Sequence, residues 1–155
     1  MPYVQLGTTH TYTNWPRSGT ALYALVDGKG GVDHVISAST PPMDEVTLAA
    51  IEIVGARIRD FAWNEVLAGS PITSRKITTT GPATLVAFWW GDGGVRHDKM
   101  ALPNNGFQVI DAVLESGALV QCAVAVKHVT DAGSYDVTWK AKPRQGAQLW
   151  IVAVE

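Results

Sequence analysis

The stretch 135-YDVTWK-140 decides the fold class, because its apolar and polar residues alternate without a break. The odd-numbered positions carry ring or apolar side chains, and the even-numbered positions carry polar ones. A repeat of two residues is the period of a β-strand, whereas an amphipathic helix repeats every 3.6 residues. The stretch therefore predicts a half-buried strand.

The run 45-EVTLAAIEI-53 shows the same alternation, although its Ala-Ala-Ile core also fits a helix over residues 44–58. Val and Ile are abundant there, and Gly55 interrupts the run. Because β-branched residues favour strands, the strand is the preferred interpretation.

Similar short runs recur along the chain at intervals of about 8–12 residues, with turn-forming Gly, Pro, Asn and Asp between them. This spacing predicts one all-β domain over residues 1–155, a two-sheet antiparallel β-sandwich with a jelly-roll-like form and about 10–12 short strands. The predicted strands are Tyr3–Leu6, Thr9–Thr13, Thr20–Val26, Asp33–Ala38, Glu45–Val54, Arg57–Phe61, Ile72–Thr79, Ala83–Trp90, Phe107–Val113, Ala118–Val126, Ser134–Ala141 and Ala147–Val154.

Residues 3–54 resemble residues 107–154 in order and character; for example, 18-SGTALYALV-26 parallels 116-SGALVQCAV-124. We interpret 3–54 as a partial repeat, 72–154 as a full repeat and 55–71 as a linker, with the copies related by a pseudo-two-fold axis. A coincidence of common strand patterns is the alternative. The first copy lacks the strand pair that precedes the second, so an open sheet edge and a homo-oligomer are predicted.

The segment 78-TTTGPATLVAFWW-90 resembles the strand-turn-strand opening of β-sandwich modules in uncharacterised bacterial exported and phage-associated proteins. The resemblance extends through 106-GFQV-109 to the last run, 149-LWIVAV-154. It implies the sandwich fold and a role in display or binding, and it carries no functional residue across. The first residues depart from it, because they lack the basic and apolar segments of an export signal.

The composition narrows the possible partners. Charged residues make up 17% of the 155, below the ~25% usual for soluble domains, and the formal net charge is -2. Lys and Arg do not cluster, so no nucleic-acid partner is predicted. No apolar run approaches the ~18 residues of a membrane span, so no membrane partner is predicted either. The localisation stays open between a virion, the cytoplasm and a non-classically exported surface.

Two groups of residues are candidate binding sites. Asp92, His97 and Asp98 lie in a Gly-rich loop where carboxylates can converge on a hard cation. The loop lacks the spacing of a calcium-binding loop, and a solvated connection is the alternative, so neither a metal nor a cofactor is predicted.

The second candidate group is aromatic and comprises Trp15, Trp89 and Trp90. Exposed Trp rings stack on sugars, whereas buried ones fill cores or interfaces. Because adjacent strand residues point to opposite faces, Trp89 and Trp90 should divide between the core and the outside.

The leading functional hypothesis is a non-catalytic structural or binding module that acts within an assembly, as a virion component, a surface module or an accessory protein. A carbohydrate-binding module that uses the exposed tryptophans is the alternative. A small hydrolase with paired carboxylates comes third, because the two carboxyl groups must face each other across a cleft, which a sequence does not show. The chain contains no nucleophile-elbow motif, so a Ser-His-Asp hydrolase has no local support.

Overall fold

The computed structural model describes residues 3–39, 46–55, 57–94, 97–118 and 121–155. Within these ranges the protein contains strands and turns and no helix, so the predicted all-β class is confirmed. A long apolar helix that could cross a membrane is therefore not found in the described part of the chain. The strands are β1 Val4–Tyr12, β2 Trp15–Ala24, β3 Ile58–Gly69, β4 Ile72–Thr73, β5 Ile77–Thr79, β6 Ala83–Gly91, β7 Met100–Pro103, β8 Gln108–Val113, β9 Gln121–Val129, β10 Gly133–Tyr135, β11 Thr138–Lys142 and β12 Gln145–Val154.

A five-stranded antiparallel sheet in the order β3-β12-β6-β9-β8 is the centre of the structure. Strand β12 lies between β3 and β6, and all ten of its residues are buried. Its Ile151, for example, is paired with Ala62 on one side and Ala87 on the other. A strand covered on both faces reads as a nearly continuous apolar run, as in β12 and β6, whereas the edge strand β3 contains several charged and polar residues.

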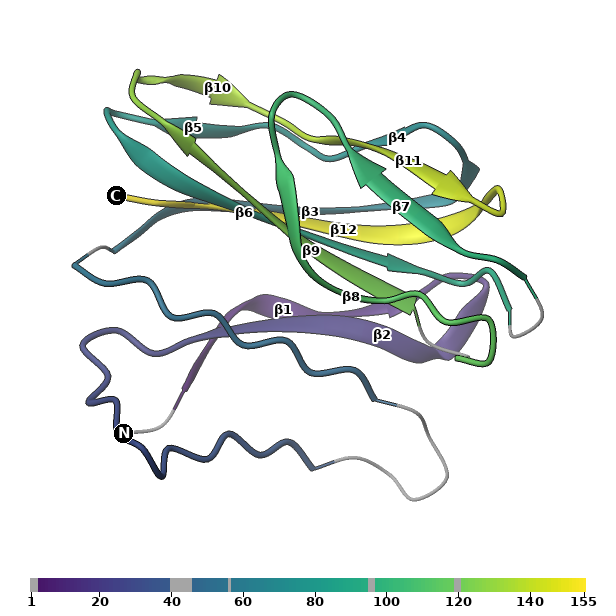
Figure 1. The fold of residues 1–155 in the computed structure, drawn as a ribbon, viewed down its shortest axis with the longest axis horizontal. Helices are drawn as coiled ribbons and strands as arrows, with labels where there is room; N and C mark the ends of the chain where they lie inside the picture. The colour runs from purple at the N-terminus through teal and green to yellow at the C-terminus, as the bar shows by residue number, and fades with distance from the viewer. Residues whose placement is uncertain (1–2, 40–45, 56, 95–96, 119–120) are drawn as a thin grey trace.

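Smaller sheets cover one face of this large sheet (Figure 1). They are the three-stranded sheet β4-β11-β7 and the pair β10-β5. Alternate residues of β6, β9 and β12 point toward them and form the main core with residues of β4, β5, β7 and β11. The largest fully buried side chains of this core are those of Trp89, Trp139, Ile77, Leu85, Leu149 and Ile151.

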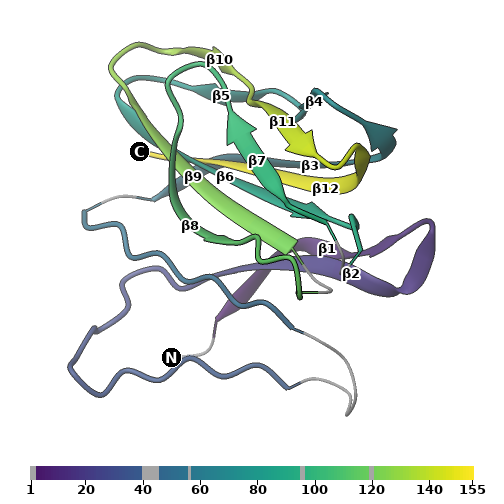
Figure 2. The same cartoon turned by 45° about the vertical axis from the view of Figure 1, so that its right-hand side comes forward.

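The opposite face of the large sheet is covered by the hairpin β1-β2 and by an extended segment that follows it (Figure 2). Val86, Val124 and Val152 point to this side and form a second apolar cluster. Leu22 from β2 and Ile51 from the extended segment pack against them. We refer to residues 25–39 and 46–55 as the arm; its second run, 46–55, lies between the large sheet and the first run.

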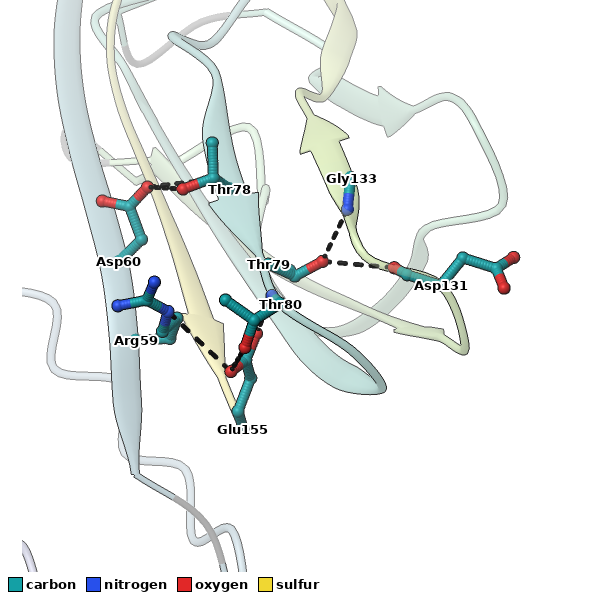
Figure 3. A network of polar contacts seen from close by, with 8 residues as sticks. All are labelled: Arg59, Asp60, Thr78, Thr79, Thr80, Asp131, Gly133 and Glu155. Atoms are coloured by element: carbon teal, nitrogen blue, oxygen red, sulfur yellow. Dashed lines mark hydrogen bonds and ion pairs between the residues drawn. The ribbon is translucent and has the colours of Figure 1, made fainter.

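Side chains of β3 tie the outer edge of the large sheet to the smaller sheets. The Asp60 carboxylate accepts hydrogen bonds from the N–H and the hydroxyl of Thr78, at 2.8 and 3.0 Å (Figure 3). Further along β3, Asn64 accepts a hydrogen bond from Arg75 N–H at 2.8 Å and donates one to the Thr73 carbonyl at 3.1 Å. These contacts satisfy backbone groups of the segment that carries β4 and β5.

Several predicted strands are wrong. Residues 33–38 and 46–54 belong to no strand; Asp33 and Val54 lie in turns, and Glu45 lies outside the described residues. The predicted linker 55–71 contains β3, and β7 has no predicted counterpart. Alternation of side chains requires only an extended chain with one face against a surface. A strand also requires a hydrogen-bonded neighbour, which the arm lacks within the ranges described above.

The predicted internal repeat is not confirmed, because its paired segments occupy different places. Residues 15–24 form β2 in the two-stranded sheet, whereas β9 lies inside the large sheet. Residues 46–54 pair with no strand, while their counterpart is the central strand β12. The similarity of the two segments therefore does not extend to their pairing.

Candidate functional site

The densest polar cluster of the described residues joins the N-terminal hairpin to one end of the large sheet. The Tyr12 side chain is fully buried, and its hydroxyl donates a hydrogen bond to Asp92 Oδ2 at 2.5 Å. Asp92 Oδ1 accepts a second hydrogen bond from Gly146 N–H at 3.1 Å, and Asp92 N–H donates to the Gly146 carbonyl. Asn14 Nδ2 donates to the Tyr12 hydroxyl oxygen at 3.1 Å.

Glu65 of β3 holds the turn of the same hairpin. Its carboxylate accepts hydrogen bonds from the N–H of Thr13 at 2.9 Å and from the Thr13 hydroxyl at 2.5 Å. The Gln148 side chain donates a longer one at 3.5 Å. We call Tyr12, Thr13, Glu65, Asp92 and Gly146 the hairpin latch.

The electrostatics of the hairpin latch keep the phenol protonated. Burial raises the pKa of Tyr12 to about 12, with further contributions from the hydrogen bond to Asp92 and from the negative charges of Asp92 and Glu65. A protonated phenol is a hydrogen-bond donor, and both carboxylates already accept hydrogen bonds from the protein. Tyr12 is buried, Glu65 is half-buried and Asp92 is exposed, and the hydrogen bonds of all three side chains join the hairpin to the large sheet.

Aromatic contacts continue the attachment of the hairpin along the sheet. The His10 ring stacks on Trp63 with centroids 3.8 Å apart and planes at 5°, and it meets the edge of Trp150 at 5.2 Å. Trp150 Nε1–H donates a hydrogen bond to the Thr20 hydroxyl at 2.8 Å. Burial against these aromatic neighbours lowers the pKa of His10.

A second polar network lies near Glu155 (Figure 3). The Glu155 carboxylate accepts hydrogen bonds from the hydroxyl of Thr80, at 2.6 Å, and from its N–H, and it lies 3.9 Å from Arg59 Nε. These hydrogen bonds lower the pKa of Glu155. The Thr79 hydroxyl donates to the Asp131 carbonyl and accepts from Gly133 N–H, at 3.2 and 3.1 Å. The network connects β3 and β5 to the turn before β10.

The structure separates the predicted site residues. Trp89 is 1% exposed and lies in the core, while Trp90 points to the opposite face and meets the Tyr12 ring edge-on at 5.0 Å. Trp15 is 65% exposed in β2, where its partner across the ladder is Tyr12. The three tryptophans therefore do not form one stacking platform.

The structure also separates the candidate residues of the Gly-rich loop after β6. Asp92 belongs to the hairpin latch, whereas His97 and Asp98 are exposed to solvent. Across the residues with described positions, no three His, Cys, Asp or Glu side chains come close enough together to hold a metal ion. The one cysteine, Cys122, is half-buried, and burial raises the pKa of its thiol, which lowers its reactivity.

Sequence reasoning missed Tyr12 and Gly146 as partners of Asp92, and Glu65 as the partner of Thr13. The hydrogen-bonded pairs of the latch are separated by 52 to 80 positions in the chain. The spacing of residues within a short segment does not predict a contact between residues so far apart in the chain. The one available signal was Gly146 next to an otherwise continuous apolar strand, since a glycine there marks a close approach of another group.

Comparison of the chain with protein-family models, with curated proteins and with solved structures found no match. The functional argument therefore rests on the geometry described above.

Proposed function

We propose that this chain is a non-catalytic structural module that acts within an assembly. The main support for this proposal is the solvent-accessible surface area of the chain. The chain exposes 9384 Å², whereas a compact monomer of 16.6 kDa is expected to expose about 7,600 Å². The excess of about 1,800 Å² is roughly twice the ~800 Å² that each partner contributes to a standard protein interface.

The distribution of apolar side chains supports the same proposal. Among the residues that the structure describes, fifteen large apolar side chains are exposed, and ten of them lie between Tyr3 and Val54. Isolated exposed apolar residues are ordinary on a protein surface, but a concentration in one region is typical of an interaction surface. The engaged carboxylates of the hairpin latch support a non-catalytic role over the hydrolase hypothesis.

We further propose that residues 58–154 form a jelly-roll β-sandwich. In that fold a long hairpin is rolled up, so that the first strand pairs with the eighth, the second with the seventh and the third with the sixth. The corresponding pairs here are β3 with β12, β4–β5 with β11–β10, and β6 with β9. Jelly rolls occur in capsid and lectin domains, and the similarity to phage-associated modules agrees with a structural role.

The mass of the protein in solution tests the proposed function. Sedimentation equilibrium or light scattering at micromolar concentration should give a dimer or a larger species. A monomer of 16.6 kDa over the whole concentration range would contradict the proposal.

Carbohydrate binding is the second candidate, favoured by one observation. Trp15 presents a 65% exposed ring on a strand, which is the position of a stacking residue. Titration with soluble oligosaccharides, read by tryptophan fluorescence, should then show a change that Trp15→Ala abolishes. Unchanged fluorescence in the wild type would leave Trp15 as part of a protein contact surface.

A further inference from the structure

The backbone of the arm consists of extended stretches, 34–39 and 46–53, with turns at 26–27, 32–33 and 54–55. In the described part of residues 25–39 and 46–55, neither run belongs to a strand ladder, and a hydrogen bond from His34 N–H to the Gly31 carbonyl closes a turn. An extended chain with free N–H and C=O groups is a template for another strand.

The second run of the arm has an inner and an outer face. Ala49, Ile51 and Ile53 point inward and pack on the large sheet. The alternate positions are exposed, among them Val46 and Leu48, each more than half exposed. A segment of period two that is apolar on both faces is the pattern of a strand with a layer on each side.

The first run of the arm has no layer of its own to pack against. Val32 is fully exposed and Val35 is 82% exposed. In both views this run lies farther from the large sheet than the rest of the chain (Figures 1 and 2). The exposed valines on it contribute nothing to the core of a single chain.

An open groove borders the second run. It has a volume of about 360 Å³ and lies between Ile51–Val54 and the side chains of Thr84, Val126 and His128. A strand laid in this groove runs beside the unpaired backbone of 51–54 and covers exposed apolar surface.

The charges of the arm argue against an anionic partner. Its described residues contain Lys29 as the one Lys or Arg, against Asp27, Asp33 and Glu52. A nucleic acid or an anionic membrane would select a basic surface. Identical extended segments, in contrast, can pair antiparallel about a two-fold axis, each satisfying the other's backbone.

We propose that the arm is the surface through which a second copy of this chain binds, by strand pairing and by burial of Val32 and Val35. This inference rests on the proposed function and names its contact surface. The excess surface of about 1,800 Å² per chain is enough for one large or two standard contacts of this kind.

The test compares the self-association of the wild type with that of two double variants. Val32→Asp/Val35→Asp places charges on the arm, where they cost a single chain nothing because both side chains are exposed. Leu67→Asp/Leu102→Asp is the matched control, since both leucines are about half exposed and lie on β3 and β7. We expect the arm variant to raise the Kd of self-association about 100-fold or more, and the control to change it less than about threefold.

Amide hydrogen exchange gives a second, independent measurement. In the wild-type assembly, amides of residues 32–38 and 46–54 should exchange at least about tenfold more slowly than in the Val32→Asp/Val35→Asp protein. Unfolding of both proteins by urea checks that the variant is folded. An oligomer that the arm variant leaves intact would overturn this inference and keep the proposed function, whereas a monomeric wild type would overturn both.

Discussion

The hydroxyl of Tyr12 and the carboxylate of Asp92 are 80 residues apart in the chain and 2.5 Å apart in the structure. This hydrogen bond connects the end of β1 to the loop after β6, so it fixes the hairpin on the large sheet. The sequence suggested this loop as a candidate cation site. In the structure the Asp92 carboxylate instead accepts hydrogen bonds from Tyr12 and Gly146.

Replacement of Tyr12 by Phe should lower the free energy of unfolding by about 1–2 kcal/mol, because a hydrogen bond to a charged acceptor is lost without a change in shape. Urea denaturation measures the difference. Tyr23→Phe is the control, since Tyr23 is half exposed, and its effect should stay below about 0.5 kcal/mol. Equal effects of both substitutions would mean that the latch contributes no stability.

The same phenol predicts a dependence of stability on alkaline pH. The pKa of Tyr12 is raised to about 12 in the folded protein, above the ordinary value of 10.0. Between these two values the unfolded chain releases a proton that the folded chain keeps, so the contribution to stability is complete below pH 10 and declines above it. Urea denaturation from pH 9 to 11 should show a steeper decline for the wild type than for Tyr12→Phe. Parallel curves would contradict the assignment.

Gly146→Ala should be the most destabilising single-methyl change at the latch. A Cβ atom at position 146 would overlap the Tyr12 hydroxyl and lie 2.7 Å from the Leu67 carbonyl oxygen. We expect a loss of roughly 3 kcal/mol, because the Tyr12 ring must move from its buried position. Gly81→Ala is the control, since a Cβ there meets nothing within 4 Å. Thermal unfolding compares the two; a Gly146 variant as stable as the Gly81 variant would refute the close contact.

Asp60→Ala tests the closure of the β3 edge. The substitution leaves Thr78 N–H without its acceptor and should cost about 1–2 kcal/mol. Hydrogen exchange at the Thr78 amide should accelerate with it. Asp111→Ala, on an exposed position of β8, provides the comparison and should leave both measurements unchanged.

Acid should weaken the contact between the hairpin and the sheet through His10. Its folded pKa lies below the ordinary 6.5, so the unfolded chain binds a proton first as the pH falls. Stability is therefore complete above pH 6.5 and decreases below it. His10→Phe keeps a ring on Trp63 without the titration, so the slope of the unfolding free energy between pH 7 and 5.5 should be smaller than in the wild type. An unchanged slope would exclude His10 as its source.

The sequence predicted best where burial on both sides of a strand dictates composition. The runs 83–90 and 147–154 lie within β6 and β12, and adjacent Trp89 and Trp90 divide between two faces as the strand period requires. The predicted strand Arg57–Phe61 covers the start of β3, but its continuation to Gly69 was not predicted, because β3 lies at an edge and its Asn64 and Glu65 bind backbone groups of other segments. Such polar residues resemble a linker until their distant acceptors and donors are known.

The position of β12 has a consequence for how the protein is made. Its neighbours β3 and β6 are synthesised at least 54 residues earlier, as the bounds of β6 and β12 show, and neither can complete the large sheet without it. During translation the apolar faces of both strands must wait for this late segment, and contacts so distant in the chain form slowly. The nascent chain therefore exposes the β-forming surface of β3 and β6 until β12 has left the ribosome, so we expect protection by a chaperone, or slow synthesis at low temperature, to raise the recovery of folded protein.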